Sequence, residues 1–181
     1  MPYSSDLCKA EIRDWLRKTR PETVLDIGAG SGTYSRLFRH LLPLSTWVAL
    51  EIHDPYADRF QLKQLYDQVM IMDVREARIG PNAFHAVLLG DVLEHLPRAD
   101  AAEVLGNAWN WSDGCLIVSI PLGECPQGPS EGNEHEAHLT SWTYPEFTQF
   151  AVAEAGITKP DHAVIREDTN YRIGAFMWET S

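Results

Sequence analysis

The sequence predicts an α/β protein with a doubly wound, mostly parallel sheet, helices on both faces and a C-terminal antiparallel hairpin. Two observations predict the parallel part: short apolar segments typical of buried strands alternate along the chain with segments of helical periodicity. A third predicts the hairpin, because only a short polar turn separates the last two apolar segments. The chain has 181 residues, the usual size of one domain, and we expect a single domain over residues 1–181.

The strands are expected where the apolar runs are short and uninterrupted. The five predicted parallel strands are residues 23–27, 46–51, 68–72, 84–90 and 115–120. Two final strands, residues 162–167 and 172–178, flank the turn Asp168-Thr169-Asn170 and are predicted to pair with each other.

Helices are expected between these strands. Residues 7–18 form the helix of an N-terminal segment (residues 1–20), and residues 34–42 carry an apolar helical face that Pro43 ends. Asp54-Pro55 opens another helix, and residues 98–111 form a longer one. Thr143 and Glu146 form a capping box for a last helix, which stops near Gly156.

Composition limits the classes of partner and compartment. The net charge of -11 argues against a phosphate backbone, so nucleic acid is not expected as a partner. No apolar run approaches the roughly 20 residues that cross a bilayer, and the first residues lack a secretory pattern, so we expect a cytoplasmic protein without membrane contact. Three cysteines without metal-type pairing fit reduced thiols.

The most informative motif is a glycine-rich turn after the first strand. Residues 24–32 read VLDIGAGSG, with an acid at Asp26 and alternating glycines at Gly28, Gly30 and Gly32. These glycines permit a tight turn and leave no Cβ in the way of an approaching ligand. A strand, a glycine turn and a helix in succession are typical of a site for a nucleoside-like cofactor. The dinucleotide fingerprint needs a third small residue where this chain has Thr33, which weakens the nicotinamide alternative.

This segment resembles motif I of the class I S-adenosylmethionine (SAM) methyltransferases. The resemblance covers about residues 24–144 and implies a seven-stranded, Rossmann-like methyltransferase fold with one antiparallel strand. It also implies SAM as cofactor and S-adenosylhomocysteine as product. The implied cofactor contacts in this segment are Asp26, Gly28, Gly30, Gly32 and Tyr34.

Acids follow the second and third strands. Glu51 is a carboxylate at a strand end, where it can accept hydrogen bonds from two ribose hydroxyls. The ribose of NAD would make the same hydrogen bonds, so Glu51 does not distinguish SAM from NAD. The resemblance implies that Ile52 lies beside the cofactor, that Asp73 takes the adenine amino group and that the backbone of Val74 reaches the ring.

The fourth strand leads into GDVLEHL, which resembles motif IV of small-molecule methyltransferases of this class. The resemblance implies that the backbone at Gly90 and Asp91 lines the methionine end of SAM, with the Asp91 side chain either holding the cofactor's amino group or facing the substrate. Asp91, Glu94 and His95 are three and four residues apart, so one helical turn would put them on one side. His95 is a candidate catalytic proton acceptor, because its ordinary pKa lies near neutrality; a histidine that only shapes the pocket is the alternative.

Residues 121–142 form a long loop that we expect to close over the active site as a lid. His138 and Trp142 resemble a substrate-side element, and His138 is the second catalytic candidate, although either residue would also serve to pin the loop to the core. Glu94 and His95 complete the predicted substrate side. His135, Glu136 and His138 lack the helical scaffold of a metal motif, and no metal site is predicted.

The sequence therefore predicts a SAM-dependent methyltransferase that acts on an oxygen or nitrogen atom of a small-molecule acceptor, with carbon as a further option. We expect a monomer or homodimer. One alternative is an NAD-dependent oxidoreductase, although the chain lacks a Tyr-x-x-x-Lys signature. The other is a SAM-binding regulatory or scaffold protein without transferase activity.

Overall fold

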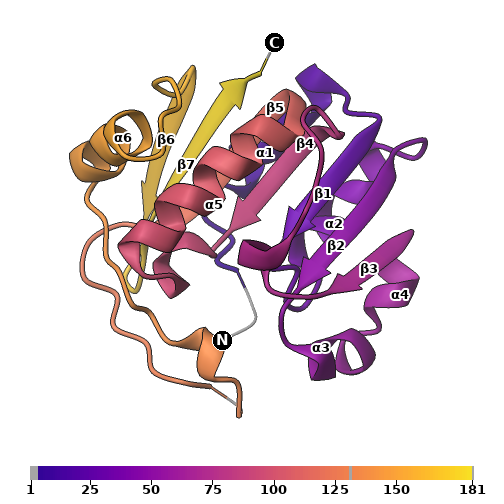
Figure 1. Ribbon diagram of the computed structural model, residues 1–181, viewed down its shortest axis with the longest axis horizontal. Coiled ribbons are helices and arrows are strands. Elements are labelled where there is room, and N and C mark those ends of the chain that lie inside the picture. Colours follow the sequence, from indigo (N-terminus) through magenta and orange to yellow (C-terminus); the bar gives the residue numbers. More distant parts are fainter. Residues whose placement is uncertain (1–3, 131, 181) are drawn as a thin grey trace.

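The computed structural model describes residues 4–130 and 132–180. Residues 1–3, 131 and 181, which belong to the expected domain and, for residue 131, to the expected lid loop, lie outside the described residues. The described chain forms a seven-stranded sheet with helices on both faces (Figure 1), as predicted. None of its described helices is both long and apolar enough to span a membrane.

The sheet has the strand order β3-β2-β1-β4-β5-β7-β6. Strands β1 to β5 pair in parallel, whereas β7 pairs antiparallel with both β5 and β6. The strands are β1 (Thr23–Ile27), β2 (Thr46–Glu51), β3 (Gln68–Ile71), β4 (Phe84–Gly90), β5 (Ser112–Pro121), β6 (His162–Glu167) and β7 (Arg172–Glu179). The predicted C-terminal hairpin is confirmed.

Most of the helices occupy predicted segments, some with shifted ends, whereas the short helix Leu62–Leu65 had no separate prediction. The helices are α1 (Lys9–Thr19), α2 (Thr33–Phe38), α3 (Asp54–Arg59), α4 (Leu62–Leu65), α5 (Arg98–Trp111) and α6 (Tyr144–Ala153), with short 3-10 helices η1 (Arg39–Leu41), η2 (Val74–Glu76), η3 (Leu93–His95) and η4 (Glu134–Glu136). Helix α1 begins two residues later than predicted because Cys8 has a left-handed backbone, with φ 63°. The capping box of Thr143 and Glu146 is formed at the start of α6.

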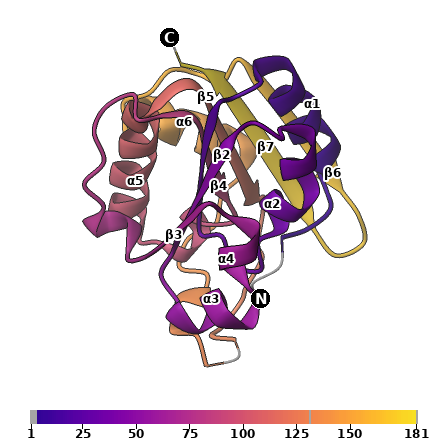
Figure 2. The same ribbon diagram turned by 90° about the vertical axis from the view of Figure 1, so that its right-hand side faces the viewer.

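Successive strand residues point to opposite faces of the sheet, and each face buries its own apolar cluster. Leu25, Val87 and Leu116 pack with α5 and α6 on one face. Val24 and Ala86 pack with α1 and α2 on the other. Figure 2, which turns the sheet, shows these two pairs of helices on opposite sides of it. Because both faces are covered, the open edge left for a ligand is at the strand ends.

Candidate functional site

A cavity of about 470 Å³ opens at the carboxyl ends of β1, β2 and β4. Its volume is in the range of small-molecule sites, about 300–1,000 Å³. It extends from the glycine turn to the loop 121–142 and to the N-terminal residues Ser4 and Ser5. The predicted site residues that line it are Gly28, Gly30, Tyr34, Glu51, Ile52, Asp73, Val74, Gly90, Asp91, Glu94, His95 and His138.

The glycine turn is built so that its backbone comes close to the cavity. Gly28 has φ 68°, and a Cβ there would lie 2.7 Å from Cγ2 of Val92. Its N–H donates to the carbonyl of Leu50 over 2.8 Å, which ties the turn to the end of β2. A left-handed conformation at this position costs any other residue about 1–2 kcal/mol, so glycine is required by the backbone as well as by space.

Glu51 joins the end of β2 to the glycine turn. One of its carboxylate oxygens accepts the backbone N–H of Gly30 and the other accepts that of His53, each over 2.8 Å. Burial raises the pKa of Glu51, and these two hydrogen bonds act against that rise. Each oxygen keeps a lone pair, so the carboxylate remains able to accept hydrogen bonds from two hydroxyl groups of a ligand.

Asp73 lies at the end of β3 and caps η2 by accepting the N–H of Arg75 over 2.9 Å. The guanidinium of Arg75 also bonds to both Asp73 oxygens, and this hydrogen bonding lowers the pKa of the carboxyl. Arg75 reaches Asp100 of α5 over 2.7 Å as well. Asp73 is therefore an oriented carboxylate at the cavity wall beside the backbone of Val74.

The turn after β4 differs from the prediction. Asp91 has a left-handed backbone, with φ 57°, and only residues 93–95 are helical. The single helical turn expected to hold Asp91, Glu94 and His95 is therefore wrong. All three residues nevertheless line the cavity.

His95 and His138 meet at the end of the cavity away from the glycine turn, although they lie on different segments. Their rings are 4.8 Å apart, centre to centre, and nearly perpendicular. Nδ1 of His95 lies 3.2 Å from the carbonyl oxygen of Ala137, and Nδ1 of His138 lies 2.5 Å from that of Cys125. Because a carbonyl oxygen only accepts, each Nδ1 is the donor, and in a neutral ring Nε2 then keeps its lone pair. Burial lowers the pKa of His95, which favours its neutral form.

Glu94 is almost completely buried, with 1% of its surface exposed. Neither carboxylate oxygen has a hydrogen-bond partner among the residues that the structure describes. Burial, with a smaller contribution from the charge of Asp91, raises the pKa of Glu94 well above its usual range. Its backbone carbonyl accepts the N–H groups of Leu139 and Thr140 over 2.7 and 3.1 Å, which fixes the loop 121–142 against η3.

Three predicted site residues lie away from the cavity. Asp26 is buried behind the glycine turn and accepts the hydroxyl of Tyr66 over 2.5 Å. Gly32 faces the side chain of Leu65, which a Cβ would meet at 2.5 Å. Trp142 is buried in the core against α6, where its ring centre is 4.4 Å from that of Phe150. Its expected position on the substrate side is wrong, because the apolar face of α6 needs the indole for packing.

Sequence reasoning missed the N-terminal contribution to the site. The ammonium of Lys9, 7% exposed, donates to the hydroxyl of Tyr34 over 2.9 Å and to that of Ser4 over 2.6 Å. Ser4 in turn donates to the carboxylate of Asp91. The available signal was spacing, because Lys9 precedes the buried Ile12 by three residues and so shares the inner face of α1.

A second missed contact joins the loop 121–142 to α3. The hydroxyl of Tyr56 donates to Glu136 over 2.9 Å, and both residues line the cavity. Gln127 and Asn133 of the same loop also line it. No sequence pattern marked these residues, since their partners are far away along the chain.

Comparisons with known proteins agree with this geometry. A family model described as a methyltransferase domain matches residues 24–112. No curated protein sequence matches the chain.

Solved structures share the fold at low identity. The Burkholderia thailandensis 1,6-didemethyltoxoflavin-N1-methyltransferase, with S-adenosylhomocysteine bound, is 19% identical, with a TM-score of 0.70 over 95% of this chain and 76% of that one. The magnesium protoporphyrin IX methyltransferase from Synechocystis, also with S-adenosylhomocysteine, is 16% identical, with a TM-score of 0.69 over 95% and 81%. The mitomycin 7-O-methyltransferase is 18% identical, with a TM-score of 0.64. That match covers 89% of this chain and 50% of the mitomycin enzyme. At these identities the similarities establish the fold.

Proposed function

We propose that this chain is a class I SAM-dependent methyltransferase that transfers the methyl group to an oxygen or nitrogen atom of a small-molecule acceptor. The observation that carries the proposal is the continuity of one cavity, which runs from the glycine turn and Glu51 to His95 and His138. A cofactor held at the first end would therefore meet an acceptor at the second. Transfer to carbon is the alternative within the same chemistry.

The residues at the first end fit SAM. The glycine turn brings backbone without side chains to the cavity, and Glu51 offers acceptors for two ribose hydroxyls. Asp73 and the backbone of Val74 would take the adenine, and Gly90 and Asp91 the methionine end. A Cβ at residue 90 would lie 2.0 Å from the ring of Tyr34, so the wall there is close-packed backbone.

SAM supplies an electrophilic methyl group through its sulfonium, so the protein has to align the acceptor and exclude water. Described residues of the loop 121–142, with Ser4 and Ser5, line the cavity and would cover the acceptor; hydrogen bonds from Leu139 to Glu94 and from Ser4 to Asp91 hold them there. A hydroxyl acceptor must also lose a proton. The Nε2 of His95 or His138 is the proposed group that accepts it.

The test is methyl transfer from isotopically labelled SAM to a panel of small phenols, carboxylic acids and amines, with binding of SAM and NAD measured by calorimetry. We expect SAM to bind and at least one acceptor class to be labelled. Binding of NAD without SAM would overturn the assignment. Binding of SAM with no labelled product and no S-adenosylhomocysteine would favour a regulatory or scaffold role.

A matched pair of variants tests the cofactor end. Glu51→Gln removes the charge of an acceptor that would bind the ribose, and a hydrogen bond to a charged group contributes about 1.5–3 kcal/mol. We therefore expect SAM affinity to fall by about 10- to 100-fold. The control is Glu22→Gln, because Glu22 is exposed and precedes β1 at the opposite end of the sheet. The Glu22→Gln variant should bind SAM with the same affinity as the wild type.

A further inference from the structure

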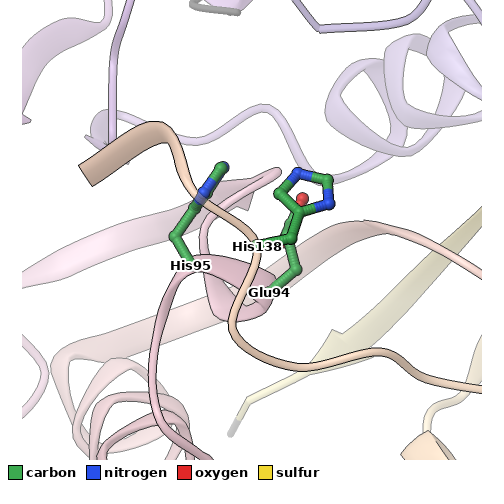
Figure 3. Close-up of side chains that lie close together, drawn as sticks. All are labelled: Glu94, His95 and His138. Carbon is green, nitrogen blue, oxygen red and sulfur yellow. The ribbon is translucent and has the colours of Figure 1, made fainter. Parts of the chain in front are cut away.

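Glu94, His95 and His138 gather potential metal ligands at one point. One ligand atom from each lies within 4.8 Å of those from the other two. Figure 3 shows the three side chains close together, two from the turn after β4 and one from the loop 121–142. In a tetrahedral site, ligands about 2.1 Å from the ion lie about 3.4 Å apart, so side-chain rotations must close the widest gap by about 1.4 Å to bring these atoms into coordination.

The histidines are prepared for this role by their backbone contacts. Each Nδ1 donates to a carbonyl oxygen, that of Ala137 for His95 and that of Cys125 for His138. Metal-binding histidines usually donate their second ring N–H to a carbonyl or carboxylate in this way, which fixes the tautomer and orients the ring. With Nδ1 occupied in this way, Nε2 is the atom that each neutral ring offers to a cation.

Glu94 supplies an independent observation. A carboxylate removed from water needs a cation or hydrogen-bond donors, because burying an unpaired polar group costs several kcal/mol. Glu94 is 1% exposed, and both of its oxygens lack a partner within residues 4–130 and 132–180. The residues around it in the described chain leave this need unmet, whereas a cation held with the two histidines would meet it.

We propose that Glu94, His95 and His138 bind one divalent cation such as Zn²⁺, Mn²⁺ or Co²⁺. Imidazole suits Zn²⁺ and Co²⁺, and the carboxylate suits Mn²⁺ as well, and three protein ligands leave a position open for a further ligand, as in catalytic zinc sites. No metal site is predicted from the sequence, because the candidate ligands that are close together along the chain all lie in the loop 121–142. The fold adds Glu94 and His95 from a distant turn.

The open position gives the cation a role in the reaction, and this role rests on the proposed function. A cation attracts an acceptor oxygen and lowers the pKa of its hydroxyl, so that the proton passes to water. The oxygen–methyl bond then forms as the methyl–sulfur bond breaks, giving the methylated acceptor and S-adenosylhomocysteine. The oxidation state of the cation does not change. In this arrangement His95 and His138 are ligands, which replaces their role as proton acceptors.

Metal binding is measured first, without SAM or acceptor. Untagged protein is treated with a chelator, dialysed and titrated with Co²⁺, followed by visible absorption, and with Zn²⁺, followed by calorimetry. We expect one equivalent to bind. Glu94→Gln and His138→Gln should each weaken binding at least tenfold, whereas His40→Gln, which alters an exposed histidine, should bind as the wild type does.

Folding of each variant is checked by circular dichroism and by SAM affinity. His138 lies on a loop, so its variant keeps the test valid if Glu94→Gln fails to fold. Absence of stoichiometric binding, or equal binding by wild type and His138→Gln, would overturn the metal site. Full methyl transfer by metal-free protein would overturn the role of the cation in the reaction but not the metal site itself. Metal binding without transfer to any acceptor would leave the site standing and refute the proposed function.

Discussion

Asp26→Asn tests whether the acid of the glycine motif is a structural group. Burial raises the pKa of Asp26 from 3.8 to about 7, against the lowering effects of the Tyr66 hydrogen bond and the charge of Lys9. The folded protein then binds a proton at Asp26 more tightly than the unfolded chain does. Stability from this group is therefore full below about pH 4 and is lost as the pH rises toward and through 7.

The size of the effect follows from the two pKa values. Between pH 5.5 and pH 8, a shift from 3.8 to about 7 removes about 2 kcal/mol from the free energy of unfolding. An asparagine cannot ionise, and its carbonyl can still accept the hydroxyl of Tyr66. Asp26→Asn should therefore lose about 2 kcal/mol less than the wild type over the same pH range.

The assay is urea denaturation followed by tryptophan fluorescence at pH 5.5, 6.5, 7.2 and 8. The quantity compared is the change in unfolding free energy with pH, so pH effects common to both proteins cancel. Asp113→Asn is the control, because Asp113 is an exposed acid on β5. Its pH profile should parallel that of the wild type.

Parallel profiles for wild type and Asp26→Asn would refute the reasoning about Asp26. The same variant decides its relation to the cofactor. Asp26 lies outside the cavity lining, so SAM affinity should stay within about twofold of the wild type. A tenfold loss of SAM affinity in Asp26→Asn would instead support the cofactor contact that the motif implied.

Three further substitutions distinguish residues that stabilise the fold from residues that also form the cavity. Gly28→Ala imposes a left-handed conformation and a clash with Val92, so it should cost at least about 1–2 kcal/mol in urea denaturation and weaken SAM binding tenfold or more in calorimetry. Trp142→Ala leaves a void against α6 and should cost about 3–5 kcal/mol, with SAM affinity nearly unchanged where the protein is folded; a loss below 1 kcal/mol would contradict its place in the core. Thr143→Ala removes a helix cap and should cost about 1 kcal/mol, and an unchanged midpoint of denaturation would count against that cap.

Local patterns predicted the parts of the site that depend on strand ends. Glu51, Asp73 and Gly90 each follow an apolar run, and parallel pairing brings such ends to one edge of the sheet. Once the order of the strands in the sheet is known, the positions of these residues at the cavity follow. The same reasoning failed for Trp142, because an aromatic residue in a loop carries no sign of which apolar surface it will cover.

The turn after β4 shows why spacing alone misled. Residues three and four apart share a face only if the backbone between them is helical. At Asp91 the backbone is left-handed, so the helix prediction was wrong while the residues still reached the cavity. Contacts between distant segments, such as Lys9 with Tyr34, had no counterpart in a local pattern.

The sequence by itself determined the α/β class, the succession of elements and the glycine turn, because periodicity and backbone preference are local properties of neighbouring residues. Only the tertiary structure decided which polar groups meet. It placed Asp26 behind the turn, brought Ser4 to Asp91, and brought His138 to Glu94 and His95. These encounters depend on chain segments far apart in sequence, whose positions are fixed by the packing of the whole sheet and its covering loops.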